Sequence, residues 1–174
     1  MKKIFSLIIF VSLAHLSFGQ LAVTRWYTIE EAEKLNAVKP KKFIIDVFTD
    51  WCGWCKKMDK ETFTDPVIVQ YLNDNYYAVK LNAEQTAPIN FAGRVFKNQN
   101  SGERSTHELA QALLNGQMSY PSYAFLAENL SLITVVPGYK DAKSLEQILV
   151  FLKEEKYKTQ KFDEFVANFK GKVK

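Results

Sequence analysis

The two cysteines of the chain, Cys52 and Cys55, lie two residues apart in the motif Trp51-Cys52-Gly53-Trp54-Cys55-Lys56. The motif comes shortly after the apolar run Phe43–Phe48, which predicts a buried strand, and we expect a helix to begin near the first cysteine. A sulfur at a helix N-terminus lies at the positive end of the helix dipole, where a thiolate is favoured. The spacing therefore predicts thiol–disulfide chemistry in which Cys52 attacks and Cys55 resolves the mixed disulfide.

Other uses of the two cysteines are less consistent with their spacing. A structural disulfide between residues so close in sequence restrains little of the unfolded chain. A structural zinc site usually needs two ligand pairs, and the chain has no second cysteine pair. A copper-binding module could use Cys52 and Cys55 with Met58 or Met118 as soft ligands. We expect no metal and no cofactor other than a redox-active Cys52–Cys55 disulfide, and copper binding is the alternative from a different class.

The first 19 residues have the features of an export signal. Lys2 and Lys3 give a basic start, Ile4–Leu13 is apolar, and Ser17 and Gly19 are small enough for a signal peptidase. The apolar stretch is shorter than the roughly 20 residues that cross a bilayer. We therefore expect a cleaved signal peptide at residues 1–19, one domain at residues 20–174, a periplasmic or secreted location and no stable membrane insertion.

The charge of the chain is nearly balanced. Loss of Lys2 and Lys3 would lower the formal net charge from +4 to +2, which argues against a general nucleic-acid binder. His107 would then be the only histidine, and we expect it at the surface rather than in catalysis. The tail from Lys156 to Lys174 has six lysines, which a solvated helix face and a frayed end explain better than binding to anionic lipid.

Local patterns predict an alternation of helices and strands. Thr28 and Glu31 form a capping box, and Asp65 followed by Pro66 is a typical helix start. The expected helices run over residues 28–38, from Cys52, from Asp65, from Asp141 to about Leu152, and around Phe162–Phe169. The expected strands are Lys42–Thr49, Tyr76–Asn82, and the antiparallel pair Ser122–Ala127 and Ser131–Val136.

Residues 83–118 are the least regular part of the sequence. We expect a small hairpin around Gly93 and a helix from Ser105 or Thr106 to Leu114, closed by Gly116. The segment is too short to bury a core of its own, so we interpret it as an insertion into the domain. Since it leads into Tyr120-Pro121, it is a candidate wall of a substrate groove.

Four features together resemble the thioredoxin superfamily, over roughly residues 25–155. The cysteine motif matches the family's Trp-Cys-x-x-Cys-Lys, and Asp46, six residues before Cys52, matches its buried acid. Val79–Asn82 matches the strand that carries its lysine, here Lys80, and Tyr120-Pro121 matches its cis-proline. The export signal and the residues after the motif are similar to small periplasmic thioredoxin-like proteins and to the C-terminal domain of DsbD.

The fold implied by this resemblance is α/β: a thioredoxin fold with a central mixed β-sheet flanked by helices. The insertion would precede the cis-proline, and a further helix would follow at the C-terminus. Gly53-Trp54 replaces the Gly-Pro of typical thioredoxins. This departure lies between the two cysteines and bears on the redox direction and the substrate, not on the fold.

The resemblance also implies roles for single residues. Asp46 should be buried with a raised pKa and accept the proton of Cys55, with Lys80 modulating its charge. The alternative is an aspartate that satisfies a backbone N–H at a strand end. A cis Pro121 would leave the Tyr120 backbone free to pair with an extended substrate segment, whereas a trans proline at a strand start is the alternative.

Trp51, Gly53 and Trp54 are expected to shape the rim that contacts substrate. For Trp51, packing in the core is an equally good interpretation. The sequence as a whole predicts an exported thiol–disulfide oxidoreductase that reduces disulfides of periplasmic proteins. Its expected partners are disulfide-bearing exported proteins and a DsbD-like membrane electron donor. An oxidase or isomerase is the alternative within the class, although no dimerisation region typical of isomerases is evident.

Overall fold

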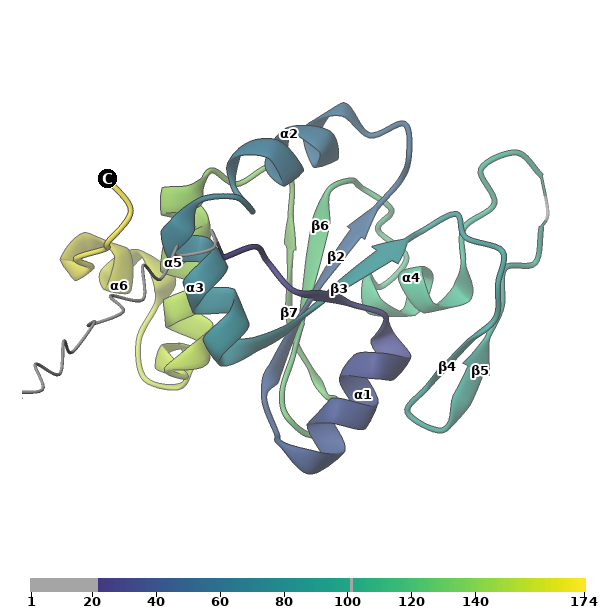
Figure 1. Ribbon diagram of the computed structural model, residues 1–174, viewed down its shortest axis with the longest axis horizontal. Coiled ribbons are helices and arrows are strands. Elements are labelled where there is room, and N and C mark those ends of the chain that lie inside the picture. Colours follow the sequence, from purple (N-terminus) through teal and green to yellow (C-terminus); the bar gives the residue numbers. More distant parts are fainter. Residues whose placement is uncertain (1–21, 101) are drawn as a thin grey trace, which may run out of the picture.

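The computed structural model describes residues 22–100 and 102–174, so the expected signal peptide lies outside the described residues. A five-stranded sheet forms the centre, with helices on both of its sides (Figure 1). The helices are α1 (Ile29–Val38), α2 (Gly53–Glu61), α3 (Pro66–Asn75), α4 (Glu108–Leu113), α5 (Ala142–Lys153), the short 3-10 helix η1 (Lys156–Lys158) and α6 (Phe162–Asn168). The strands are β1 (Trp26–Tyr27), β2 (Lys42–Phe48), β3 (Tyr76–Asn82), β4 (Ile89–Phe91), β5 (Arg94–Phe96), β6 (Ser122–Leu126) and β7 (Leu132–Pro137). Within the described residues, no helix is both long and apolar enough to cross a bilayer.

The strand order β1-β3-β2-β6-β7 places β2 in the middle of the sheet. β2 runs parallel to β3 and antiparallel to β6, and β6 pairs antiparallel with β7, so the sheet is mixed, as predicted. In this register Asp46 lies beside Lys80 on β3 and beside Tyr123 on β6. Strand pairing therefore makes two of the candidate residues, Asp46 and Lys80, direct neighbours.

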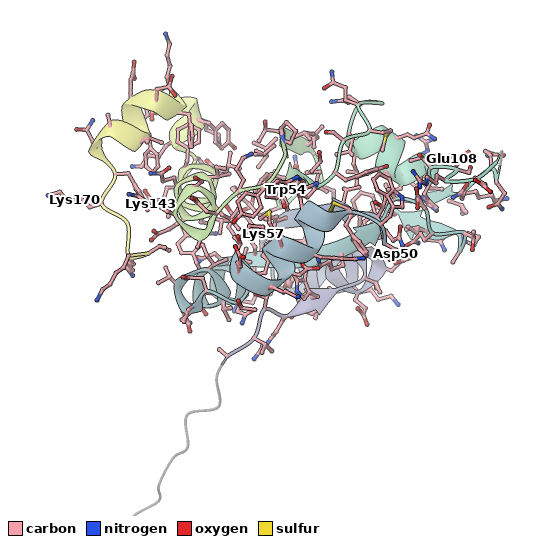
Figure 2. All side chains as sticks on the ribbon, turned by 90° about the horizontal axis from the view of Figure 1, so that it is seen from above. Asp50, Trp54, Lys57, Glu108, Lys143 and Lys170 are labelled. Carbon is pink, nitrogen blue, oxygen red and sulfur yellow. A yellow bond between two sulfur atoms is a disulfide. The ribbon has the colours of Figure 1, made fainter. Side chains whose placement is uncertain are left out.

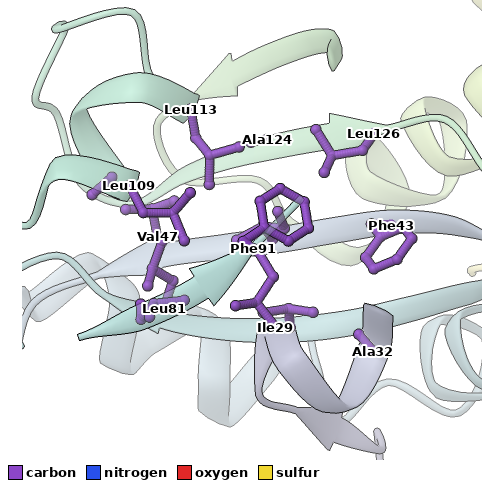
Figure 3. Close-up of a cluster of buried hydrophobic side chains, with 14 of the residues drawn as sticks. Ile29, Ala32, Phe43, Val47, Leu81, Phe91, Leu109, Leu113, Ala124 and Leu126 are labelled. Carbon is purple, nitrogen blue, oxygen red and sulfur yellow. The ribbon is translucent and has the colours of Figure 1, made fainter. Parts of the chain in front are cut away.

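Each face of the sheet carries its own apolar core. The face that we call the insertion-side core is covered by α1, α4 and the β4–β5 hairpin (Figure 3). Its large apolar side chains from the segment between β3 and β6 are Ile89, Phe91, Phe96, Leu109, Leu113 and Leu114. The opposite face, the α2-side core, is covered by α2, α3 and α5 and also receives Phe165 of α6. β2 serves both cores because successive residues of a strand point to opposite faces.

The helix starts follow the signals in the sequence. Thr28 caps α1 by accepting the Glu31 N–H at 3.2 Å, and the Glu31 carboxylate accepts the Thr28 N–H at 2.8 Å. Asp65 caps α3, and Asp141 caps α5. These predictions are confirmed because a cap depends only on residues within one turn of the helix start.

The start of α4 differs from the prediction. Neither Ser105 nor Thr106 caps this helix, because His107 does so by accepting the Leu109 N–H on Nδ1 at 3.2 Å. The expected surface position of His107 is also wrong, since the residue is 0% exposed. Its Nε2 lies 3.2 Å from the Ala87 carbonyl oxygen. Burial of this imidazole is tolerated because both of its nitrogens have partners.

The C-terminal tail is docked, so the expectation of a frayed end is wrong. Glu146 on α5 is 3% exposed, and its carboxylate accepts the N–H groups of Lys172 at 2.7 Å and Val173 at 3.1 Å. A carboxylate can be buried here because two donors satisfy it. The side chains of Lys170 and Lys172 are exposed, as the sequence predicted.

Candidate functional site

Cys52 and Cys55 lie at the start of α2, just after the loop that leaves the central strand β2. Cys52 is the N-cap residue, and its Sγ accepts the N–H of Cys55 at 3.1 Å. The two sulfurs are joined in a disulfide, and the two residues are only 4% and 3% exposed. Cys52 is thus the sulfur that faces the N–H groups of the helix N-terminus, a position that stabilises a thiolate.

Two aromatic pairs flank the cysteine motif. Trp51 and Trp54 are 50% and 59% exposed, so core packing is the wrong interpretation of Trp51. Trp51 meets the Tyr120 ring edge-on at 5.8 Å between centroids, and Trp54 at the start of α2 lies 5.3 Å from the Tyr139 ring (Figure 2). A Cβ on Gly53 would meet nothing within 4 Å, so packing does not demand glycine there. Exposed rings around a buried disulfide offer apolar contact area to a partner.

Asp46 is paired through one carboxylate oxygen only. Its Oδ2 lies 2.7 Å from Lys80 Nζ, and the same ammonium lies 2.5 Å from Asp59 Oδ1 on α2. Its Oδ1 is buried and has no hydrogen-bond partner within the described part of the chain. The sequence analysis did not single out Asp59. Its position one helical turn after Cys55, on the same side of α2, is the signal that could have identified it.

Burial raises the pKa of Asp46 from 3.8 to about 6. The Lys80 ammonium acts against this rise by favouring the carboxylate, whereas the negative charge of Asp59 adds to it. Burial has the larger effect because the side chain is 2% exposed and one oxygen is unpaired. The expected raised pKa is thus present in the structure. A carboxyl group of this kind changes its protonation state near neutral pH, as proton transfer requires.

Aromatic rings surround the Lys80 ammonium on the sides that the two aspartates leave. Its Nζ lies 4.7 Å from the ring centroid of Trp26, 5.0 Å from that of Phe48 and 5.6 Å from that of Phe63. The negative ring faces attract an ammonium group, so these contacts help to hold the Lys80 side chain in place. Lys80 on β3 therefore links Asp46 on β2 to Asp59 on α2, one helical turn after Cys55.

The Tyr120-Pro121 turn leads into β6 opposite the Trp51 ring. The peptide bond between the two residues is cis. The Pro121 carbonyl accepts the N–H of Gly138 at 2.8 Å. Within the described residues, the backbone N–H and C=O of Tyr120 form no hydrogen bond. These two groups are available to a chain that adds alongside them.

The segment between β3 and β6 contacts the aromatic rim at three points. Glu84 Oε1 accepts the Trp51 indole N–H at 2.9 Å. The Arg104 guanidinium lies 4.8 Å from the Trp51 ring centroid. Burial raises the pKa of the Tyr120 hydroxyl, and the nearby Thr106 side chain acts against this rise. No local pattern identifies these three residues, because their contacts join loops that are distant along the chain.

The described residues contain no group of three or more His, Cys, Asp and Glu side chains arranged to hold a metal ion. Met58, one candidate copper ligand, is fully buried in the α2-side core. Its thioether accepts the Tyr123 hydroxyl and the Lys140 N–H. Met118 packs instead against the insertion-side core. The two thioethers belong to opposite faces of the sheet and do not form one ligand set with the cysteines.

Sequence comparison finds relatives for part of the chain. Residues 29–153 match a family described as the thioredoxin-like domain. The thiol:disulfide interchange protein DsbD of Haemophilus ducreyi is 43% identical over 53 residues, 30% of this chain and 9% of that protein. DsbD of Salmonella typhi is 37% identical over 75 residues, 42% of this chain and 12% of that protein. The aligned stretches thus span about a tenth of these longer relatives.

Solved structures with a similar fold cover more of the chain. A thioredoxin-fold protein from Helicobacter pylori aligns with a TM-score of 0.57 and 17% identity, over 84% of this chain and 85% of that one. A Thermus thermophilus thioredoxin aligns with a TM-score of 0.55 and 15% identity, over 74% and 86%. The DsbH oxidoreductase aligns with a TM-score of 0.54 and 15% identity, over 80% and 88%. Identities this low bear on the fold alone.

Proposed function

Because the chain belongs to the thioredoxin-like domain family and carries the cysteine pair of a thiol–disulfide oxidoreductase, we propose that it is exported and reduces disulfides of periplasmic proteins. The observation that carries this proposal is the Cys52–Cys55 disulfide at the N-terminus of α2, the helix that Asp59 joins to the buried Asp46–Lys80 pair. The DsbD relatives, named for thiol:disulfide interchange, support the same chemistry.

The reaction begins with the reduced protein. The Cys52 thiolate attacks one sulfur of the substrate disulfide, a bond forms between them, and the other substrate sulfur leaves as a thiolate that takes a proton. Cys55 then loses its proton to the unpaired oxygen of Asp46 and attacks Cys52. The second substrate sulfur leaves, and the Cys52–Cys55 disulfide forms. Two electrons have passed to the substrate, and a membrane donor similar to DsbD restores the dithiol.

The aromatic rim and the cis-proline turn bind the substrate. An extended segment pairs with the backbone of Tyr120, while Trp51 and Trp54 cover its apolar side chains on either side of the disulfide. Tyr120, Pro121, Trp51, Gly53 and Trp54 are the residues that we assign to substrate contact. Because several rings take part, the rim suits an unfolded or extended protein segment.

The first experiment tests the two cysteines separately. Purified Cys55→Ser protein should accumulate a mixed disulfide with a model protein disulfide such as insulin, because the attacking sulfur remains and the resolving one is gone. Cys52→Ser is the matched control and should trap nothing. Non-reducing electrophoresis and mass spectrometry read the outcome. Trapping by Cys52→Ser alone would reverse the two assignments, and trapping by neither would contradict the proposed chemistry.

The second experiment tests the direction. Equilibration with glutathione buffers gives the reduction potential, which we expect near the thioredoxin value of about −270 mV. A value near the DsbA potential of about −120 mV would identify an oxidase instead. Copper titration of the reduced protein separates both from a copper-binding module, for which stoichiometric binding without disulfide turnover is the signature.

A further inference from the structure

Trp51 directly precedes the attacking cysteine, and the structure surrounds its ring on three sides. The Tyr120 ring meets it in a T-shaped contact with 5.8 Å between centroids, Glu84 accepts its indole N–H, and the Arg104 guanidinium lies over it, 4.8 Å from the ring centroid. Although so many groups contact it, the residue remains 50% exposed. The ring is thus held in one orientation while part of its surface faces solvent.

The side chain of Arg104 makes no ion pair or hydrogen bond that would stabilise the fold within the described residues. It is exposed, and no carboxylate lies within ion-pair distance of it and no acceptor within hydrogen-bond distance among the described residues. Its one recorded contact is therefore the Trp51 ring. A planar guanidinium suits this contact because it stacks on aromatic faces, which a lysine ammonium does not.

The loop that carries Arg104 is fixed by a buried amide. Asn98 is 7% exposed, and its Nδ2 donates to the carbonyl oxygens of Ser105 at 2.7 Å and Gln85 at 3.1 Å. Its Oδ1 accepts the Ser105 hydroxyl at 2.6 Å. Asn98 therefore joins the turn after Glu84 to the loop of Arg104, the two elements that hold Trp51.

Thr106 extends the same arrangement to the cis-proline turn. Its side chain lies near the Tyr120 hydroxyl and acts against the rise in the Tyr120 pKa that burial causes, and the Tyr120 ring packs against Trp51. Trp51 and Tyr120 flank Cys52 and Pro121, the two positions where a substrate segment must lie. Residues of the insertion thus support both rings of one side of the groove.

A polar pocket of about 340 Å³ continues from this side of the groove. It lies between the loop before α2 and the insertion, and its lining includes Asp50, Asn82, Glu84, Asn98 and Arg104. A single small disulfide compound at Cys52 would not reach along this surface, whereas the residues flanking a cysteine in a peptide would.

We infer that Arg104 and Thr106 are positioning residues that hold the Trp51–Tyr120 pair as a wall for the substrate chain, and that they select peptide disulfides over small ones. This inference rests on the proposed function. It assigns to the insertion a part in recognition and none in electron transfer. Loss of either contact should leave the attack of Cys52 chemically the same and weaken only the contribution of the flanking peptide.

The test uses the Cys55→Ser protein and two compounds with the same leaving group. One is the thionitrobenzoate mixed disulfide of N-acetylcysteine N-methylamide; the other is an uncharged eight-residue peptide whose cysteine carries a thionitrobenzoate, so the two compounds have the same charge. Attack by Cys52 forms the mixed disulfide and releases coloured thionitrobenzoate in both cases, so the ratio of the two rate constants reports on binding of the peptide alone. Arg104→Gln and Thr106→Val should each lower the peptide-to-small ratio about three- to tenfold, the worth of one such contact.

The matched control is Arg94→Gln, because Arg94 also stacks on an aromatic ring of the insertion, Phe96, at 4.9 Å but does not touch Trp51. This variant should keep the wild-type ratio. Arg104→Lys should fall with Arg104→Gln, since it keeps the charge and loses the stacking plane. Full rescue by lysine would overturn positioning by stacking, and an unchanged ratio in Arg104→Gln and Thr106→Val would overturn the inference altogether.

A spectroscopic measurement tests positioning independently of rate. The Trp51 indole N–H resonance should move in Arg104→Gln, while the indole resonance of Trp54 should not, because Trp54 packs on Tyr139 instead. A Trp51 resonance that stays in place would contradict the inference. Failure of the Cys55→Ser protein to react with either compound would refute the proposed function, which keeps the two failures distinguishable.

Discussion

The buried carboxyl group of Asp46 makes the free energy of unfolding depend on pH. Burial raises its pKa from 3.8 to about 6, so the folded protein binds the proton more tightly than the unfolded chain does. The contribution of Asp46 to stability is therefore fully present below about pH 3.8 and is lost as pH rises through about 6. Over that range the difference amounts to about 3 kcal/mol in the free energy of unfolding.

Replacement by asparagine should remove this dependence. Asp46→Asn keeps an oxygen for Lys80 but cannot ionise, so its free energy of unfolding should gain about 2 kcal/mol on the wild type between pH 4 and pH 8. Urea unfolding at the two pH values measures the gain. Asp163→Asn on the exposed surface of α6 is the control and should follow the wild type. Parallel profiles for Asp46→Asn and wild type would contradict burial as the cause of the shift.

Although Asp46→Asn should be more stable than the wild type, it should be less active. Without a proton acceptor, resolution of the mixed disulfide by Cys55 should slow, while the first attack by Cys52 should not. Stopped-flow measurement with a peptide disulfide separates the two steps. A loss confined to the first step, or no loss at any pH, would leave Asp46 with a structural role only.

At the scale of elements, the start of α4 depends on the protonation of one buried histidine. His107 accepts a hydrogen bond on Nδ1, which only the neutral ring can do. Burial lowers the pKa of His107 below its ordinary value of 6.5. The stability that His107 provides is therefore present above about pH 6.5 and is lost as pH falls through the folded value. Glu108 and Glu30 partly oppose the shift.

Two variants separate the cap from the titration. His107→Asn keeps a capping oxygen and should be less sensitive to acid than the wild type between pH 6.5 and 4.5. His107→Ala loses the cap, at about 1 kcal/mol, in addition to the packing of the ring. Hydrogen exchange of the α4 amides at several pH values is the measurement. Equal acid sensitivity in wild type and His107→Asn would show that this histidine is not the group responsible.

The C-terminal tail is held by hydrogen bonds from the backbone next to Gly171 to the Glu146 carboxylate on α5. A Cβ at Gly171 would overlap the buried Glu146 carboxylate and lie 3.0 Å from the Phe169 ring. Gly171→Ala should therefore release the tail, with a loss of about 1.5–3 kcal/mol for the hydrogen bonds to a charged acceptor. Trypsin should then cut faster after Lys170 and Lys172. Gly53→Ala, whose Cβ meets nothing within 4 Å and whose φ is not positive, controls for the loss of a glycine. An unchanged cleavage rate would mean that the tail accommodates the added Cβ and stays bound to α5, which would contradict the prediction.

At the scale of the whole molecule, the segment between β3 and β6 is part of the core. Its six large apolar side chains from Ile89 to Leu114 fill the insertion-side core against β2, β3 and β6. Each contributes about 1.5–3 kcal/mol through burial, and a whole domain is stable by only about 5–15 kcal/mol. Replacing residues 86–117 with a short linker should therefore abolish cooperative unfolding. Reaction with small disulfides and with peptide disulfides should be lost together.

Circular dichroism during urea unfolding checks this prediction. Single substitutions on the surface of the segment, such as Arg94→Gln, should by contrast unfold cooperatively like the wild type. A linker variant that still unfolds in one sharp transition would mean that the remaining domain is stable without the apolar side chains of this segment. The insertion thus has to be studied by point substitution rather than by deletion.

The sequence by itself determined the features that depend on near neighbours in the chain. The caps at Thr28, Asp65 and Asp141, the strand β2 and the cysteine pair at the start of α2 were all predictable. Helix starts and buried strands are specified by residues within a few positions of one another, so a local pattern is sufficient evidence for them. The resemblance to the thioredoxin superfamily then supplied the central mixed sheet flanked by helices, whereas the strand order is read from the structure.

Only the tertiary structure decided which distant residues meet. Strand register brings Lys80 to Asp46, and the packing of α2 on the sheet adds Asp59 to the same ammonium. The burial of His107 and the stacking of Arg104 on Trp51 depend on where the insertion packs. No local pattern specifies these contacts, because their free energy comes from side chains that are far apart in sequence and close only in the folded chain.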